Sequence, residues 1–137
     1  MPSNIKEFED QLKKFGEVYV PSMHTKLVRK LALDVLQRVV LRTPVDTGIA
    51  RANWMVAVNK VPVGTIEIEN LSKEKATNFA MNNGIPVIEN CKEYSSISIA
   101  NNLPYIGVLE FEGHSKQAPD GMVRITLAEI ESTFNKK

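Results

Sequence analysis

The clearest pattern in the chain is a helical one between residues 22 and 42. Apolar side chains recur there every three or four positions, and charged side chains share the opposite side. Thr43 precedes Pro44, and a residue before proline is disfavoured in the helical conformation, so we expect the helix to end there. The predicted buried face consists of Leu27, Val28, Leu31, Ala32, Val35, Leu36, Val39 and Val40.

Two further helices are predicted near the two ends of the chain. Residues 4–15 form the first, with Ser3 or Asn4 as its N-cap and Gly16 as its end. Asp120 is expected to cap the last helix, in which apolar side chains recur at helical spacing. That apolar stripe consists of Val123, Leu127, Ile130 and Phe134.

The middle of the chain carries the alternating pattern of β-strands. Trp54, Val56 and Val58 alternate with a second row of side chains that begins at Asn53 and ends at Asn59. Residues 66–69 alternate between isoleucine and glutamate. Pro62 and Gly64 mark a bend between these segments, so together they predict a β-hairpin. Residues 96–99 alternate in the same way and predict another strand.

Three segments around the last strand are less regular. Ser72 can cap a short helix that we expect to stop near residues 83–84. Residues 105–111 fit a helix or an extended segment, and the pattern leaves this choice open. Residues 113–121 are rich in polar and small side chains and predict an exposed loop.

The order of these elements predicts an α+β fold. Helices, including the long amphipathic one at residues 22–42 and the C-terminal one, are expected to pack on one face of a small, mainly antiparallel sheet. The length of 137 residues fits a single domain, with residues 1–20 as its N-terminal helical part. Trp54, Tyr105 and Cys91 are expected to lie in the core.

Charge excludes a strong general attraction to nucleic acid or to an anionic membrane. Lysine and arginine number 17 against 16 aspartates and glutamates, which gives a formal net charge of +1. The distribution is uneven, because residues 26–42 hold five cations and one anion, whereas residues 67–112 hold seven anions and three cations. Opposite charges on one chain can favour head-to-tail contact between copies.

The sequence also predicts where the chain resides. It has no apolar run near the ~20 residues that a membrane helix needs, and residues 1–7 lack the pattern of a secretory signal. Its one cysteine, Cys91, cannot form an intramolecular disulfide, which favours a reducing compartment. We therefore expect a cytoplasmic location.

One short motif suggests catalysis. An apolar residue followed by Asp-Thr-Gly, here Val45 to Gly48, occurs at the active site of aspartic proteases, where two carboxylates share a proton. A chain of this length would need a homodimer that contributes Asp46 twice. However, Asp46 follows a long helix and a proline, and the same residues are ordinary turn formers. A protease is therefore kept only as an alternative.

No other residues assemble a reaction. His24 and His114 lie far apart and in no metal-binding spacing, and no glycine-rich phosphate or dinucleotide motif is present. We expect no enzyme activity, no cofactor, no metal and no small-molecule substrate. Nucleic-acid binding by the basic helix face, through Lys26, Arg29 and Lys30, remains a second alternative.

Three segments resemble a known family when they are taken together and in order. They are TPVDTG with RANW after it (residues 43–48 and 51–54), NNLPYIGVLEFEGHS (residues 101–115) and QAPDGMVR (residues 117–124). This combination is similar to the signature of phage neck proteins, the tail-completion or head–tail joining family of long-tailed siphophages.

The resemblance implies a structural protein that forms a ring between the capsid connector and the tail tube. Its implied partners are copies of itself, connector or head-completion proteins, and tail-tube or tail-terminator proteins. DNA would pass through the lumen without sequence-specific binding, and the implied location is the virion, after assembly in the host cytoplasm. The expected structural turn motif is Thr43, Pro44, Asp46, Thr47 and Gly48. The expected interface residues are Arg38, Arg42, Glu110, Gly113, His114, Ser115, Lys116, Gln117, Ala118 and Pro119.

Overall fold

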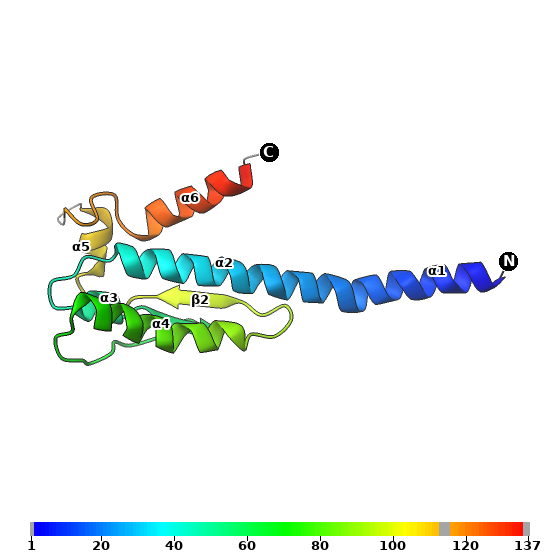
Figure 1. Ribbon diagram of the computed structural model, residues 1–137, viewed down its shortest axis with the longest axis horizontal. Helices are drawn as coiled ribbons and strands as arrows, with labels where there is room; N and C mark the ends of the chain where they lie inside the picture. The colour runs from blue at the N-terminus through cyan, green and yellow to red at the C-terminus, as the bar shows by residue number, and fades with distance from the viewer. Residues whose placement is uncertain (1, 113–115, 136–137) are drawn as a thin grey trace.

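The structure of the protein is a computed structural model that describes residues 2–112 and 116–135. A long helical rod dominates it (Figure 1) and consists of α1 (Pro2–Lys14), the π-helical turn η1 (Phe15–Tyr19) and α2 (Val20–Arg42). The prediction that Gly16 ends the first helix is wrong. The Val20 N–H donates to the Phe15 carbonyl, which gives a widened turn directly before Pro21. Proline would disrupt a regular turn there, and the widened turn lets the helix continue.

The predicted end of the long helix is confirmed. Thr43 leaves the helical conformation with φ −70° and ψ 124°, immediately before Pro44. The predicted buried face is confirmed only in its C-terminal half, where Leu36, Val39 and Val40 are fully buried. Leu27 is 48% exposed, whereas Thr25 and Arg29 on the same part of α2 face the loop after α4.

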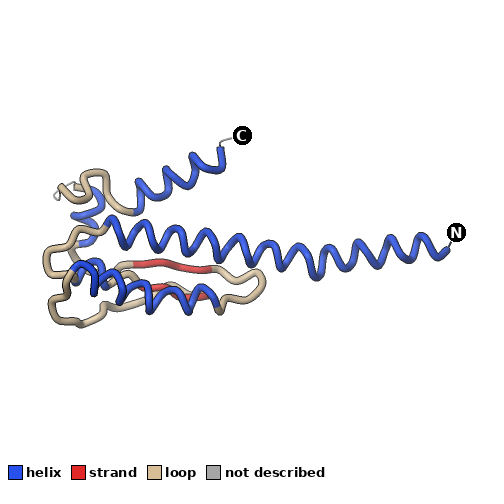
Figure 2. Tube along the Cα trace, in the orientation of Figure 1, coloured by secondary structure: helices blue, strands red, loops and turns tan. Residues whose placement is uncertain are grey.

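The sheet has two antiparallel strands, β1 (Met55–Val58) and β2 (Ile97–Ala100). Met55 lies opposite Ala100, and Val58 lies opposite Ile97. Figure 2 shows the two strands in red, surrounded by helices. The α+β fold class is therefore confirmed, with α2 and α4 (Lys73–Glu89) in contact with each other and with the sheet.

The predicted hairpin is wrong. The first strand begins only at Met55, because α3 (Ile49–Ala52) precedes it, and its partner is β2 rather than residues 66–69. Instead, the fully buried side chain of Asn53 makes two hydrogen bonds to the backbone of Ile66. Its Oδ1 accepts the Ile66 N–H at 2.7 Å and its Nδ2 donates to the Ile66 carbonyl at 3.2 Å. These two bonds replace those that a strand partner would make.

The helix predicted after Ser72 is confirmed at its start and wrong at its end. The Ser72 hydroxyl accepts the Lys75 N–H at 3.3 Å, as an N-cap does. The helix does not stop at Gly84 but continues to Glu89. A Cβ on Gly84 would lie 2.5 Å from Cδ2 of Leu36, so this glycine permits close packing of α4 on α2 rather than ending the helix.

The C-terminal part of the chain adds two helices. The stretch that the pattern left open is helical, as α5 (Ile106–Phe111), and the last helix is α6 (Val123–Asn135). Leu127 and Phe134 are 54% and 57% exposed, so the predicted apolar stripe of α6 is only partly buried. In the described part of the chain, none of the helices combines the length and apolar character needed to cross a bilayer.

Candidate functional site

The segments that carry the family resemblance meet at the C-terminal end of α2. They enclose a pocket of about 490 Å³, which we call the α2-end pocket. Its walls come from the turn after α2, from α3, from α5 and from the loop before α6. The lining residues are Pro44, Val45, Asp46, Thr47, Gly48, Ala50, Tyr105, Leu109 and Gln117.

The buried side chain of Arg51 supports this region by hydrogen bonds from inside the fold. Arg51 is 3% exposed, and its guanidinium donates to the carbonyl of Thr43 at 2.9 and 3.2 Å and to the carbonyl of Leu41 at 2.9 Å. A fourth bond, at 2.9 Å, reaches the hydroxyl of Thr77 on α4. Carbonyls at a helix C-terminus lack helical partners and carry partial negative charge, so Arg51 both satisfies and neutralises the end of α2. Burial lowers the pKa of Arg51, although an arginine remains protonated.

Trp54 is confirmed as a core residue, at 4% exposed. Its indole N–H donates to the Thr43 hydroxyl at 2.6 Å, and that hydroxyl donates to the Val39 carbonyl at 2.6 Å. Tyr105, in contrast, is 44% exposed on the pocket wall, so its predicted core position is wrong.

The turn motif has a structural cause. Gly48 has φ +82°, and a Cβ there would lie 2.4 Å from the Leu71 carbonyl oxygen. Next to it, the Thr47 carbonyl accepts the Leu71 N–H at 2.7 Å, which anchors the segment that leads into α4. Asp46 is exposed at the pocket, on a bend that follows a helix.

The loop before α6 is less exposed than predicted. Gln117 pairs with the backbone of Val45, accepting its N–H at 3.0 Å and donating to its carbonyl at 3.3 Å. Ala118 is 3% exposed, so it anchors the loop in the core, whereas Lys116 and Pro119 are exposed. The other predicted interface residues of this loop, Gly113, His114 and Ser115, lie outside the described residues.

Glu110 has an internal role that was not predicted from the sequence. It is 6% exposed, and its carboxylate accepts the N–H groups of Met122 at 2.6 Å, Val123 at 3.0 Å and Arg124 at 2.8 Å. Burial by itself would raise the pKa of Glu110. The three N–H donors and the charge of Arg124 outweigh burial and hold this pKa below its ordinary value.

Glu110 thereby performs the capping that was predicted for Asp120. An anion at a helix N-terminus satisfies free N–H groups and interacts favourably with the helix dipole. The sequence signal for this role was a single glutamate within the apolar stretch of residues 105–111. A carboxylate that is buried in such a stretch is stable only with hydrogen-bond or charged partners.

Arg38 and Arg42, which were expected at an interface, bond to α6 of the same chain. Arg38 bonds to Asp34 at 2.7 Å and to Glu129 at 2.5 Å. Arg42 pairs with Glu129 and donates to the Thr126 hydroxyl at 3.1 Å. Part of the basic character of α2 is thus neutralised within the chain.

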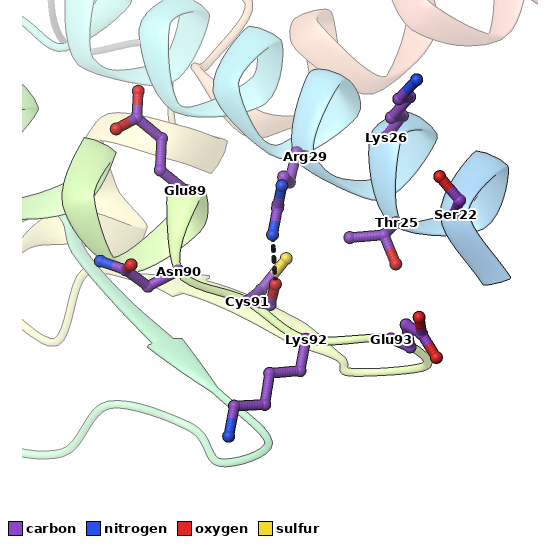
Figure 3. Close-up of a pocket in the computed structure, with 9 residues that line it drawn as sticks. All are labelled: Ser22, Thr25, Lys26, Arg29, Glu89, Asn90, Cys91, Lys92 and Glu93. Carbon is purple, nitrogen blue, oxygen red and sulfur yellow. Dashed lines mark hydrogen bonds between the residues drawn. The ribbon is translucent and has the colours of Figure 1, made fainter. Parts of the chain in front are cut away.

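A second pocket lies between the first half of α2 and the loop after α4 (Figure 3). Arg29 reaches across it and donates to the carbonyl of Cys91 at 2.7 Å, while Cys91 itself is 2% exposed, as predicted for a core residue. Lysines and glutamates both line this pocket, so its charge does not select one kind of ligand. Among residues 2–112 and 116–135, no group of three or more His, Cys, Asp or Glu side chains could hold a metal ion.

Comparisons with known proteins add no relative to this picture. The chain matches no protein-family model. No curated protein and no solved structure matches it either.

Proposed function

We propose that the chain is a non-enzymatic assembly protein of a long-tailed phage, which forms a ring that joins the capsid connector to the tail tube. The observation that carries the proposal is the convergence of residues 44–48, 105, 109 and 117 on the α2-end pocket. These residues belong to the three segments that resemble the neck family. Binding residues are disproportionately found on loops that a rigid scaffold positions, as the turn after α2 and the loop before α6 are here.

The motif residues divide into two groups by burial. Thr43, Arg51 and Trp54 are buried and hold the end of α2, α3 and α4 together. Asp46 and Tyr105 are exposed at the pocket and do not take part in holding these helices together. One aromatic and one acidic side chain at the rim of a small pocket favour binding of a protein partner over catalysis.

The proposed partners are further copies of this chain, a connector or head-completion protein, and a tail-tube or tail-terminator protein. DNA would pass through the ring without sequence-specific contacts. The proposed location is the neck of the virion, with assembly in the host cytoplasm.

Neither alternative function gains a supporting observation. For an aspartic protease, Asp46 would have to end a strand beside a second carboxylate, whereas it lies exposed on a bend after α2. For a nucleic-acid binder, the basic face of α2 should be open. Lys26 and Lys30 are exposed, but Arg29 donates to the Cys91 carbonyl, and Arg38 and Arg42 pair with Glu129, so much of this face is occupied within the chain.

Light scattering on mixtures tests the proposal. The purified chain is combined with the connector protein and, separately, with the tail-tube protein of the same phage. We expect a discrete ring-sized complex, weakened roughly 10-fold by Asp46→Lys and unchanged by Glu93→Lys, which alters an exposed acid at the second pocket. A chain that ignores both proteins contradicts the proposal, and peptide cleavage that Asp46→Asn abolishes would support the protease instead.

A further inference from the structure

The first part of the helical rod carries a continuous apolar stripe that nothing in the described chain covers. Its side chains recur at alternating spacings of three and four residues, which is the heptad pattern of a helix that packs on another helix. Each is between 49% and 61% exposed. We call this surface the α1 stripe; it consists of Ile5, Phe8, Leu12, Phe15 and Tyr19.

The position of α1 leaves the stripe accessible. Figure 1 shows α1 extending well beyond the sheet, α4 and α6. Apart from η1, which continues it, no described element packs extensively against α1. Most helical stability in proteins comes from packing of the apolar face, and the 13 residues of α1 have no such packing against another described element apart from η1. We therefore expect the α1 stripe to pack against a partner helix.

We propose that the partner is the α1 helix of a second copy of this chain, packed antiparallel. In one register Ile5 lies opposite Phe15 of the second copy, and Phe8 lies opposite Leu12. Ile5 and Leu12 occupy one apolar position of the heptad, and Phe8 and Phe15 occupy the other. Each contact in this register therefore joins the two different heptad positions, as in antiparallel helix pairs.

The charges on α1 favour the antiparallel direction. Residues 6–10 contain one lysine and three acids, whereas residues 13–14 are both lysines. In the antiparallel pair the acidic segment of one copy lies beside the basic segment of the other. Glu9, beside the stripe, then lies on the same flank as Lys13 of the second copy. In a parallel pair the two basic segments would lie beside each other, and like charges there are unfavourable.

The area of the stripe is sufficient for self-association. Five half-exposed large side chains, with the adjoining Val18 and the stems of the lysines, offer roughly 600 Å² per copy. Two copies together would bury about 1,200 Å², which is the lower bound for stable protein interfaces. An exposed apolar patch of this size is already at the upper limit for a monomer. The proposal thus predicts a dimer that is reversible at micromolar concentration.

A membrane surface fits the α1 stripe less well. Helices that lie on membranes carry mainly Lys and Arg on their polar face. The polar face of α1 and η1 has both signs in similar number, so this part of the rod offers no net attraction to anionic lipid. These charges are Lys6, Lys13 and Lys14 against Glu7, Glu9, Asp10 and Glu17.

The first test is the mass of the full chain by sedimentation equilibrium, from about 1 μM to about 1 mM. Phe8→Gln with Leu12→Gln removes the centre of the stripe but keeps good helix formers. We expect this double variant to raise the dimer dissociation constant by roughly 100-fold or more. The matched control, Val61→Gln with Val63→Gln, changes two exposed apolar residues outside the rod and should leave dimerisation unchanged.

The second test is the direction of packing. Ile5→Cys and Phe15→Cys variants are prepared separately, each with the buried Cys91 retained, and are oxidised alone and mixed. We expect a disulfide-linked dimer in the mixture and little in either variant alone, because only the mixture places the two thiols opposite each other.

Three results would overturn the inference: a wild-type chain that is monomeric across the whole range, a double variant that dimerises as well as the control, or efficient crosslinking of each cysteine variant alone. Binding of the monomer to phosphatidylcholine vesicles would assign the stripe to lipid instead. The inference does not depend on the joining role, since pairing is measured on the chain alone and joining is measured with connector and tail proteins.

Discussion

Replacement of Glu110 by alanine should loosen α6 from the fold. The variant leaves three N–H groups at the start of α6 without their acceptor, and that of the fully buried Met122 cannot be hydrated. A buried donor without a partner costs about 1–3 kcal/mol, and loss of an N-cap costs about 1 kcal/mol. We therefore expect the free energy of unfolding to fall by about 3 kcal/mol, which lowers Tm by roughly 10 °C in a domain of this size.

Urea denaturation followed by circular dichroism measures this change, with Glu131→Ala as the matched control. Glu131 is an exposed glutamate on α6, and its removal should alter stability by less than about 0.5 kcal/mol. If Glu110→Ala unfolds at the same urea concentration as the control, then the carboxylate does not hold α6 and the structural argument is wrong.

Three further variants probe the same group of contacts. The folded-state pKa of Glu110 lies below the ordinary value of 4.5, so the contribution of its carboxylate to folding stability is complete above pH 4.5 and is lost as pH falls through the folded-state pKa. The urea midpoints of wild type and Glu110→Gln should therefore differ at about pH 7 and converge in acid. Arg51→Lys should cost about 2 kcal/mol in urea denaturation, because an ammonium cannot reproduce the forked bonds to Leu41, Thr43 and Thr77. Gly121→Ala should cost about 2 kcal/mol or more in thermal unfolding, because φ is +81° and the new Cβ would lie 2.5 Å from the Glu110 carbonyl oxygen; a Tm equal to that of wild type would contradict this turn geometry.

Local rules predicted the parts of the fold that depend on neighbouring residues. The end of α2 at Thr43 follows from the proline after it, and the start of α4 follows from the Ser72 cap. The strand at Ile97–Ala100 follows from alternation alone. These features need no knowledge of the rest of the molecule.

The errors occur where a distant group decides the outcome. Residues 66–69 alternate like a strand, but the buried amide of Asn53 takes their backbone bonds. Gly84 looks like a helix stop, but it lies against Leu36 and lets two helices approach. Both interactions join residues that no local pattern connects.

The candidate site shows the same division. The sequence identified residues 43–48 as a turn, and the positive φ of Gly48 agrees with that prediction. It did not reveal that Arg51 satisfies carbonyls at the end of α2, or that Glu110 and Arg42 are bonded to α6 within the chain. Charged residues were therefore assigned to interfaces when their partners lay in the same fold.

Electron microscopy of phage particles assembled without this chain tests the proposed joining role most directly. The joining role predicts separate heads and separate tails, with normal particles restored when the wild-type chain is supplied in the same cells. Intact, tailed and infectious particles in its absence would contradict that role.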